Sequence, residues 1–136
     1  MTLTPQIVGQ AENAHKPVLE RILAGTGLTG TRWIGLAIAS GSGALGREAL
    51  TGRIAGSLKI GPAESGAVVS DLIDAGLLAE QDAQITLTDA GRARHTEIRS
   101  AVDETVGRGY AGISAEDLTT AARVLTVITS QLNALA

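Results

Sequence analysis

Small or apolar residues recur at spacings of three and four in the middle of the chain, at Ser65, Val68, Val69 and Leu72. This spacing places them on one face of a helix and therefore predicts an amphipathic helix over residues 63–75. Pro62 is a suitable first helical residue. Gly76 can end the helix because glycine adopts the left-handed conformation without strain.

The pattern changes after this helix. Two short apolar runs, 77–78 and 85–87, flank a polar stretch at 79–84. Such runs predict a small hairpin of two strands with residues 79–84 as its tip. Thr88 is a suitable cap for a new helix that starts at Asp89.

Three helices are predicted before this unit. Thr4 and Pro5 start the first, which ends near residue 25 and contains Pro17. Pro17 either kinks this helix or starts a second piece at Lys16. The second helix is expected over residues 29–40 and the third over about 47–58, with the glycine-containing stretch 41–46 as a flexible connection.

Two helices are predicted after the hairpin, from Asp89 to about residue 108 and from Ser114 to the end, where Ser114 and Asp117 resemble a capping box. The last helix carries an apolar stripe of Leu118, Leu125, Ile128, Leu132 and Leu135. A terminal helix with such a stripe needs a partner in water. The simplest way to bury the first helix and the last two helices together is a helical module formed by two chains.

The amino-acid composition limits which residues can form the core and which classes of protein this chain can belong to. The chain of 136 residues is 44% hydrophobic and has no Phe and no Cys. Its core must therefore consist of Leu, Ile, Val and Ala, and disulfides and thiol chemistry are excluded. No apolar run is long enough for a membrane span, and the N-terminal residues lack a signal-peptide pattern, so we expect a cytoplasmic protein with no membrane partner.

Several short motifs appear together in a fixed order. They are Leu58-Lys59-Ile60, Gly76-Leu77-Leu78, Leu87-Thr88-Asp89-Ala90-Gly91-Arg92 and Ile113-Ser114-Ala115-Glu116-Asp117-Leu118. In this order and at this spacing they resemble the MarR (multiple antibiotic resistance) family of winged helix-turn-helix transcription regulators. The resemblance covers nearly the whole chain.

The resemblance implies a mainly α fold with a small two-stranded wing, in a single MarR-like domain spanning residues 1–136. Residues 41–88 would form the winged-helix head, and residues 1–40 and 89–136 the dimerisation helices and a ligand cleft. Proteins of this kind are homodimers that bind pseudo-palindromic double-stranded DNA. They release it when a small ligand, often aromatic or anionic, binds between head and dimer module.

The head has an unusual charge for a DNA-binding protein. Between residues 41 and 92 the basic residues are Arg47, Arg53, Lys59 and Arg92, whereas the acidic ones are Glu48, Glu64, Asp71, Asp74, Glu80, Asp82 and Asp89. DNA affinity comes largely from Lys and Arg that neutralise phosphates. The wing also lacks the Asp-Arg-Arg that typical family members carry. The candidate DNA contacts are Arg47, Arg53, Lys59, Ala63, Glu64, Ala67, Ser70, Gln81, Gln84 and Arg92.

Two classes of function therefore stay open. The first is a dimeric DNA-binding regulator. The second is a winged-helix protein with an acidic head that no longer binds DNA. It would instead bind a small molecule or a protein, or catalyse a reaction. No nucleophile elbow, phosphate-binding loop or metal spacing supports an enzyme, and no cofactor is expected.

The candidate ligand residues lie on the first two predicted helices: His15, Leu19, Arg32, Trp33 and Leu36. Trp33 is suited to stacking on an aromatic ligand, and Arg32 to pairing with a carboxylate. Alternatively Trp33 is a core residue, since it is the largest apolar side chain present. His15 either bonds carbonyls near Pro17 or faces solvent.

Overall fold

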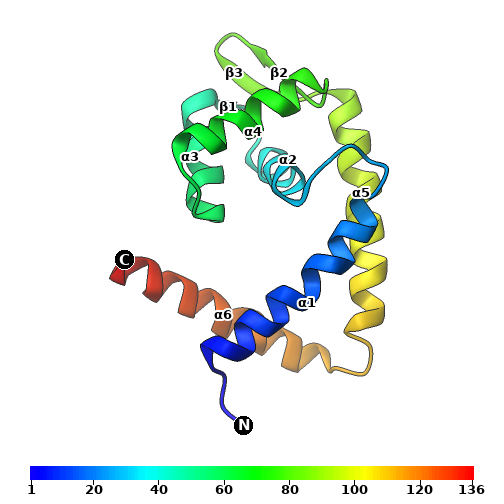
Figure 1. Ribbon diagram of the computed structural model, residues 1–136, viewed down its shortest axis with the longest axis vertical. Coiled ribbons are helices and arrows are strands. Elements are labelled where there is room, and N and C mark those ends of the chain that lie inside the picture. Colours follow the sequence, from blue (N-terminus) through cyan, green and yellow to red (C-terminus); the bar gives the residue numbers. More distant parts are fainter. The chain divides into compact units, whose positions relative to one another are not determined.

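The computed structural model describes all 136 residues, which form two compact units, Met1–Asp103 and Glu104–Ala136. The first unit holds the helices α1 to α4, a small sheet and most of α5 (Figure 1). The second unit holds the end of α5 and the last helix, α6. The predicted mainly α winged-helix fold is confirmed.

The helix α1 spans Pro5–Leu23 without interruption at Pro17. Thr4 caps it as predicted, because its hydroxyl accepts a hydrogen bond of 3.2 Å from the Ile7 N–H. The His15 ring nitrogen Nδ1 lies 2.6 Å from the Ala11 carbonyl oxygen of the same helix. Of the two interpretations of Pro17, a new helix starting at Lys16 is therefore wrong.

The core of the first unit lies between α2 (Gly30–Ser42), α3 (Arg47–Leu58) and α4 (Pro62–Asp74). The side chains of Leu36, Ile54, Val69 and Leu72 are fully buried there. Gly35 allows the close approach of α2 to α4, since a Cβ at this position would lie 2.7 Å from Cγ1 of Val68. The helix α2 runs two residues beyond the predicted end.

Ser65 is the buried polar residue of the core, at 0% exposure. Its hydroxyl donates a hydrogen bond of 2.6 Å to the carbonyl oxygen of Thr51 on α3. Burial of a hydroxyl is favourable only when it is hydrogen-bonded. This bond fixes α4 against α3 and confirms the predicted inner face of α4.

The sheet has three antiparallel strands in the order β1-β3-β2: β1 (Leu45–Gly46), β2 (Leu78–Gln81) and β3 (Gln84–Leu87). The prediction of a flexible connection over 41–46 is wrong, because residues 41–42 end α2 and Leu45 pairs with Ile85. The predicted tip 79–84 is also too long. Only Asp82 and Ala83 form the turn, both with positive φ, as in two-residue hairpin loops of type I′.

The helix α5 (Asp89–Gly109) starts where the hairpin ends. The Thr88 hydroxyl accepts a hydrogen bond of 2.9 Å from the Gly91 N–H and donates one of 2.6 Å to the Gly76 carbonyl oxygen. Gly91 lies directly against the backbone, since a Cβ there would be 2.0 Å from the Leu77 carbonyl oxygen. The first turn of α5 is thus held against the junction between α4 and β2.

The helix α6 spans Ala115–Leu135 and is capped as predicted by Ser114, whose hydroxyl accepts a hydrogen bond of 3.0 Å from the Asp117 N–H. No residue of α6 is buried. Several of its large apolar side chains are exposed: Leu125, Val127, Leu132 and Leu135. Of the predicted apolar stripe, Leu125, Leu132 and Leu135 are exposed, whereas Leu118 and Ile128 are half-buried.

Candidate nucleic-acid and ligand sites

The helices α3 and α4 with their short connection form a helix-turn-helix. The connecting residue Lys59 is exposed and adopts the left-handed conformation (φ 57°, ψ 43°), in which it ends α3. A side chain with a Cβ is strained in this conformation, and glycine is the usual residue at such a helix end. Because a lysine in this conformation costs stability, Lys59 is a candidate functional residue.

The outward face of α4 carries small or acidic side chains. Ala63, Glu64 and Ala67 are exposed, and Ser70 is half-buried. The helix itself contains no Lys or Arg. As a single element it would therefore repel an anionic partner.

Neighbouring elements supply α4 with two arginines. Arg47, the first residue of α3, donates a short hydrogen bond from Nη2 to the Ser70 hydroxyl. Arg32 on α2 forms an ion pair with Asp71, with 2.9 Å between Nη2 and Oδ2. The first contact brings a positive charge to the outward side of α4, and the second compensates one of its carboxylates.

The other predicted basic contacts lie away from α4. Arg53 donates a hydrogen bond of 3.1 Å to the hydroxyl of Ser42 at the end of α2. Arg92 is exposed and pairs with Asp89 at 3.1 Å in the first turn of α5. Gln81 and Gln84 face each other in the register of the hairpin, next to its turn, and both are exposed.

The predicted ligand residues differ in how deeply they are buried. Trp33 and Leu36 are buried in the core, and Leu19 packs against it from α1. Arg32 is partly exposed, and His15 is exposed on α1. The interpretation of Trp33 as a core residue is confirmed.

Trp33 also has an aromatic neighbour that the sequence analysis missed. Its ring stacks on the His95 ring of α5, with 5.3 Å between the centroids and 24° between the planes. Burial, together with repulsion from the Arg99 guanidinium, lowers the pKa of His95 below its ordinary value of 6.5. Next to it, Arg94 donates a hydrogen bond of 2.8 Å to the Thr26 carbonyl oxygen and so joins α5 to the loop after α1.

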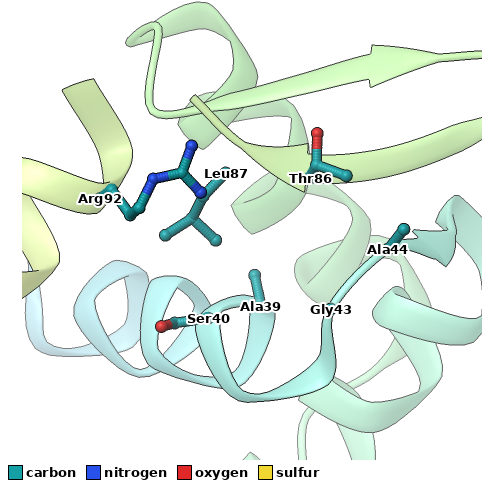
Figure 2. A pocket seen from close by; sticks show the side chains of 7 residues that line it. All are labelled: Ala39, Ser40, Gly43, Ala44, Thr86, Leu87 and Arg92. Carbon is teal, nitrogen blue, oxygen red and sulfur yellow. The ribbon is translucent and has the colours of Figure 1, made fainter. Parts of the chain in front are cut away.

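A hollow of about 280 Å³ lies between the end of α2, the strand β3 and the start of α5. Figure 2 shows the side chain of Arg92 extending over it from α5, with Leu87 beside the guanidinium. The lining residues are Ala39, Ser40, Gly43, Ala44, Thr86, Leu87 and Arg92. Of these, only Arg92 was predicted as a site residue.

No three His, Cys, Asp or Glu side chains gather as a metal site would require. None of the helices combines the length and the apolar character needed to cross a membrane.

Comparisons with known proteins identify the fold. No family model matches the chain, and no curated protein matches it. Among solved structures, ligand-free NadR superposes with a TM-score of 0.82 at 21% identity, covering 98% of both chains. The MarR family protein Rv2887 of Mycobacterium tuberculosis, solved in complex with DNA, gives a TM-score of 0.74 at 23% identity and covers 94% of this chain and 98% of its own.

A third structure is CouR from Rhodococcus jostii RHA1 bound to p-coumaroyl-CoA. It gives a TM-score of 0.77 at 19% identity and covers 90% of this chain and 88% of its own. Similarity at these identities establishes a common fold over nearly the whole chain. A common fold does not determine function, which depends on the residues of the individual chain.

Proposed function

We propose that this chain, which has the fold of MarR-family transcription regulators, is itself such a regulator: a homodimer that binds double-stranded DNA and responds to a small molecule. Each head would place α4 in a major groove of a pseudo-palindromic site. The proposal includes no catalytic role, and the expected compartment is the cytoplasm.

The observation that carries the proposal is the contact of Arg47 with Ser70. It supplies the outward side of α4 with the cation that the helix lacks. A guanidinium in this position is suited to a phosphate or to the acceptor edge of guanine. Lys59, in its strained conformation at the helix-turn-helix connection, adds a second cation on the same motif.

The proposed roles of the remaining candidate DNA-contacting residues follow from their positions in the structure. Arg53 and Arg92 would hold phosphates, and the exposed Gln81 and Gln84 would approach DNA from the hairpin. The exposed residues of α4 that would face base edges are Ala63, Glu64 and Ala67, together with the half-buried Ser70.

The proposed dimer is based on the exposed apolar side chains of α6. This helix has no buried residue in the single chain, and its exposed leucines would be costly in water. A second copy of the chain would cover them. Homodimers of twofold symmetry also match a pseudo-palindromic site, because each head would then meet one half-site.

The Arg32–Asp71 ion pair suggests how a ligand would act on α4. Arg32 is one of the predicted ligand residues that remain accessible, together with His15, whereas Trp33 and Leu36 are core residues. A ligand carboxylate that pairs with Arg32 would leave Asp71 uncompensated on the DNA-reading helix. An unpaired carboxylate there would weaken DNA binding by repulsion from phosphates.

The test is binding of the purified full-length protein to the DNA that flanks its own coding region, compared with a random duplex of equal length. Measurements at about 50 mM and about 200 mM salt separate specific from purely electrostatic binding. We expect a nanomolar dissociation constant for the flanking DNA at the higher salt. Binding no tighter than to the random duplex at both salts would contradict the proposal.

Two variants test whether Lys59 and Arg47 contribute to DNA binding. Lys59→Gly relieves the left-handed strain and should stabilise the fold by up to about 1 kcal/mol, yet weaken binding to all DNA alike. Arg47→Gln should weaken binding without this stabilisation. The matched control is Arg99→Gln, because Arg99 lies on α5 in an exposed pair with Asp103 and should leave DNA binding unchanged.

The alternative is a protein of the same fold that binds a small molecule or a protein instead of DNA. The excess of carboxylates over basic residues in the head favours it, because an acidic surface repels DNA at long range. The same experiment decides between the two, since the alternative requires that neither duplex be bound.

A further inference from the structure

We propose that Arg47 reads one guanine in each half-site of the bound DNA, and that Ser70 positions its guanidinium for this contact. This role rests on the proposed function and makes Arg47 a base reader where a phosphate contact was the alternative. Base reading would then come from a residue of α3, while the helix in the groove, α4, supplies the positioning hydroxyl.

The outward face of α4 has no side chain of its own that matches guanine. In the major groove guanine presents two acceptors, N7 and O6. Ala63 and Ala67 have no hydrogen-bonding side chain, Ser70 offers a single O–H donor, and a carboxylate such as Glu64 can only accept. The helix contains no Lys or Arg. The guanidinium of Arg47 is therefore the group that can donate to both acceptors from this face.

The backbone holds both partners of this hydrogen bond in place. Arg47 directly follows β1, whose Gly46 is paired with Gln84 of β3. Ser70 directly follows Val69, which is fully buried in the core. The plane of the guanidinium is thus fixed before DNA binds, so little side-chain entropy is lost on contact. A bidentate contact with a base edge requires such a fixed plane, whereas a phosphate can be met from many directions.

The position of Arg47 in its helix also indicates a role in binding. It is the first residue of α3, and the N-cap residue Gly46 offers no side-chain hydrogen bond to the free N–H groups there. The helix dipole makes this end positive, so a cation is unfavourable and an acidic residue such as the neighbouring Glu48 is favourable. An arginine here lowers the stability of α3, which is typical of a functional position.

The guanidinium can bind guanine without leaving Ser70. It carries five N–H groups, of which the bond from Nη2 to the Ser70 hydroxyl uses one. Contact with N7 and O6 needs two more. Arg47 and Ser70 are both half-buried, so the group is supported by the protein but remains accessible.

The other cations of the head are less suited to this contact. Arg53 donates to the hydroxyl of Ser42 at the end of α2, and Arg92 pairs with Asp89 in the first turn of α5. Both lie away from α4 and suit phosphates. Lys59 is a point charge without the planar fork that matches two acceptors.

Modified duplexes test the contact directly. The full-length protein first selects its preferred sites from a randomised pool of duplexes at about 150 mM salt. Each guanine of the selected sites is then replaced in turn by 7-deazaguanine, which keeps the Watson–Crick pairing but lacks the N7 acceptor. We expect one guanine per half-site at which this replacement weakens binding about tenfold. The other guanines should tolerate it.

Three variants distinguish base reading from phosphate contact. Arg47→Lys keeps the charge but loses the fork, so it should keep the salt dependence and lose most of the discrimination against 7-deazaguanine. Ser70→Ala should reduce this discrimination while its affinity for a random duplex stays unchanged. Arg53→Gln is the control, since it should weaken binding to all duplexes alike, lower the salt slope by about one and keep the discrimination.

Several results would overturn this role and leave the proposed regulator intact. They are selected half-sites without guanine, full tolerance of 7-deazaguanine at every position, and discrimination that survives Arg47→Lys. Unchanged discrimination in Ser70→Ala would refute the positioning role of this serine. If no sequence is selected over random duplexes, the proposed function fails and the role of Arg47 fails with it.

Discussion

Arg32 on α2 and Asp71 on α4 are joined by an ion pair of 2.9 Å although 39 residues separate them in the sequence. Both side chains remain more than one-third exposed. The pair is therefore a connection between two helices that water and salt can weaken. Its strength determines how easily a competing carboxylate can separate them.

We predict a modest coupling between these two residues. In a double-mutant cycle with Arg32→Gln and Asp71→Asn, the interaction should contribute about 0.2–1 kcal/mol to the free energy of unfolding and decrease with added salt. Urea denaturation of the four proteins measures it. A coupling that is unchanged at about 1 M salt would mean that the pair is shielded from solvent, contrary to its exposure.

Gly91 should tolerate no side chain. Gly91→Ala would place a Cβ against the Leu77 carbonyl oxygen, so the backbone must move, and we expect a loss of more than about 3 kcal/mol in the free energy of unfolding. Gly107→Ala on the same helix is the control. Its Cβ would meet nothing within 4 Å, and the substitution should stabilise the helix by up to about 1 kcal/mol.

Substitution on α6 tests the dimer. Leu125→Asp should convert a dimer into a monomer of 13.8 kDa in light scattering at micromolar concentration, because a buried unpaired charge opposes association. Ser130→Asp adds the same charge roughly 140° around the helix and should leave the dimer intact. A wild-type protein that is already monomeric would refute the proposed assembly.

His95 should make stability depend on pH. Its pKa in the folded protein lies below the ordinary 6.5 because burial, and then Arg99, disfavour the charged ring. As the pH falls from 6.5 towards the folded pKa, the unfolded chain takes up a proton that the folded chain does not, so stability is lost in this window. Below the folded pKa the loss from His95 is complete.

Denaturation at pH 7 and pH 5 should therefore show a larger loss of stability for the wild type than for His95→Gln. The fluorescence of Trp33, the only tryptophan, provides a second readout, because it is stacked on His95. An apparent pKa above 6.5 in this titration would contradict the prediction.

Local signals predicted most of the fold. The caps Thr4 and Ser114, the start of α4 at Pro62 and the left-handed Gly76 depend on neighbouring residues, and all are present in the structure. The inner face of α4 followed from its spacing alone. Such features are readable because the responsible interactions span only three or four residues.

The errors have equally physical causes. The strand β1 has only two residues and forms through its pairing with β3, about 40 residues away in the sequence. No local sequence pattern therefore predicts it. The turn at Asp82 and Ala83 was missed because alanine is unfavourable at positive φ, where glycine or asparagine is usual.

The candidate site was less predictable than the fold. The charge census of residues 41–92 counted Arg47 without placing it beside α4, and it did not include Arg32 of α2. Arg47 and Arg32 reach Ser70 and Asp71 only through tertiary packing, and so does His95 in its stack on Trp33. The hollow under Arg92 joins three distant segments, and its full lining had no signal in the sequence.

The hydrogen bond between Ser65 and Thr51 has a consequence for protein engineering. It holds the buried side of α4 to α3, and Ser65 itself is inaccessible from the surface. Ala63 and Ala67, on the other side, are small and exposed. This separation makes the helix a replaceable recognition module, whose outer residues can be randomised in a library while the scaffold is kept constant.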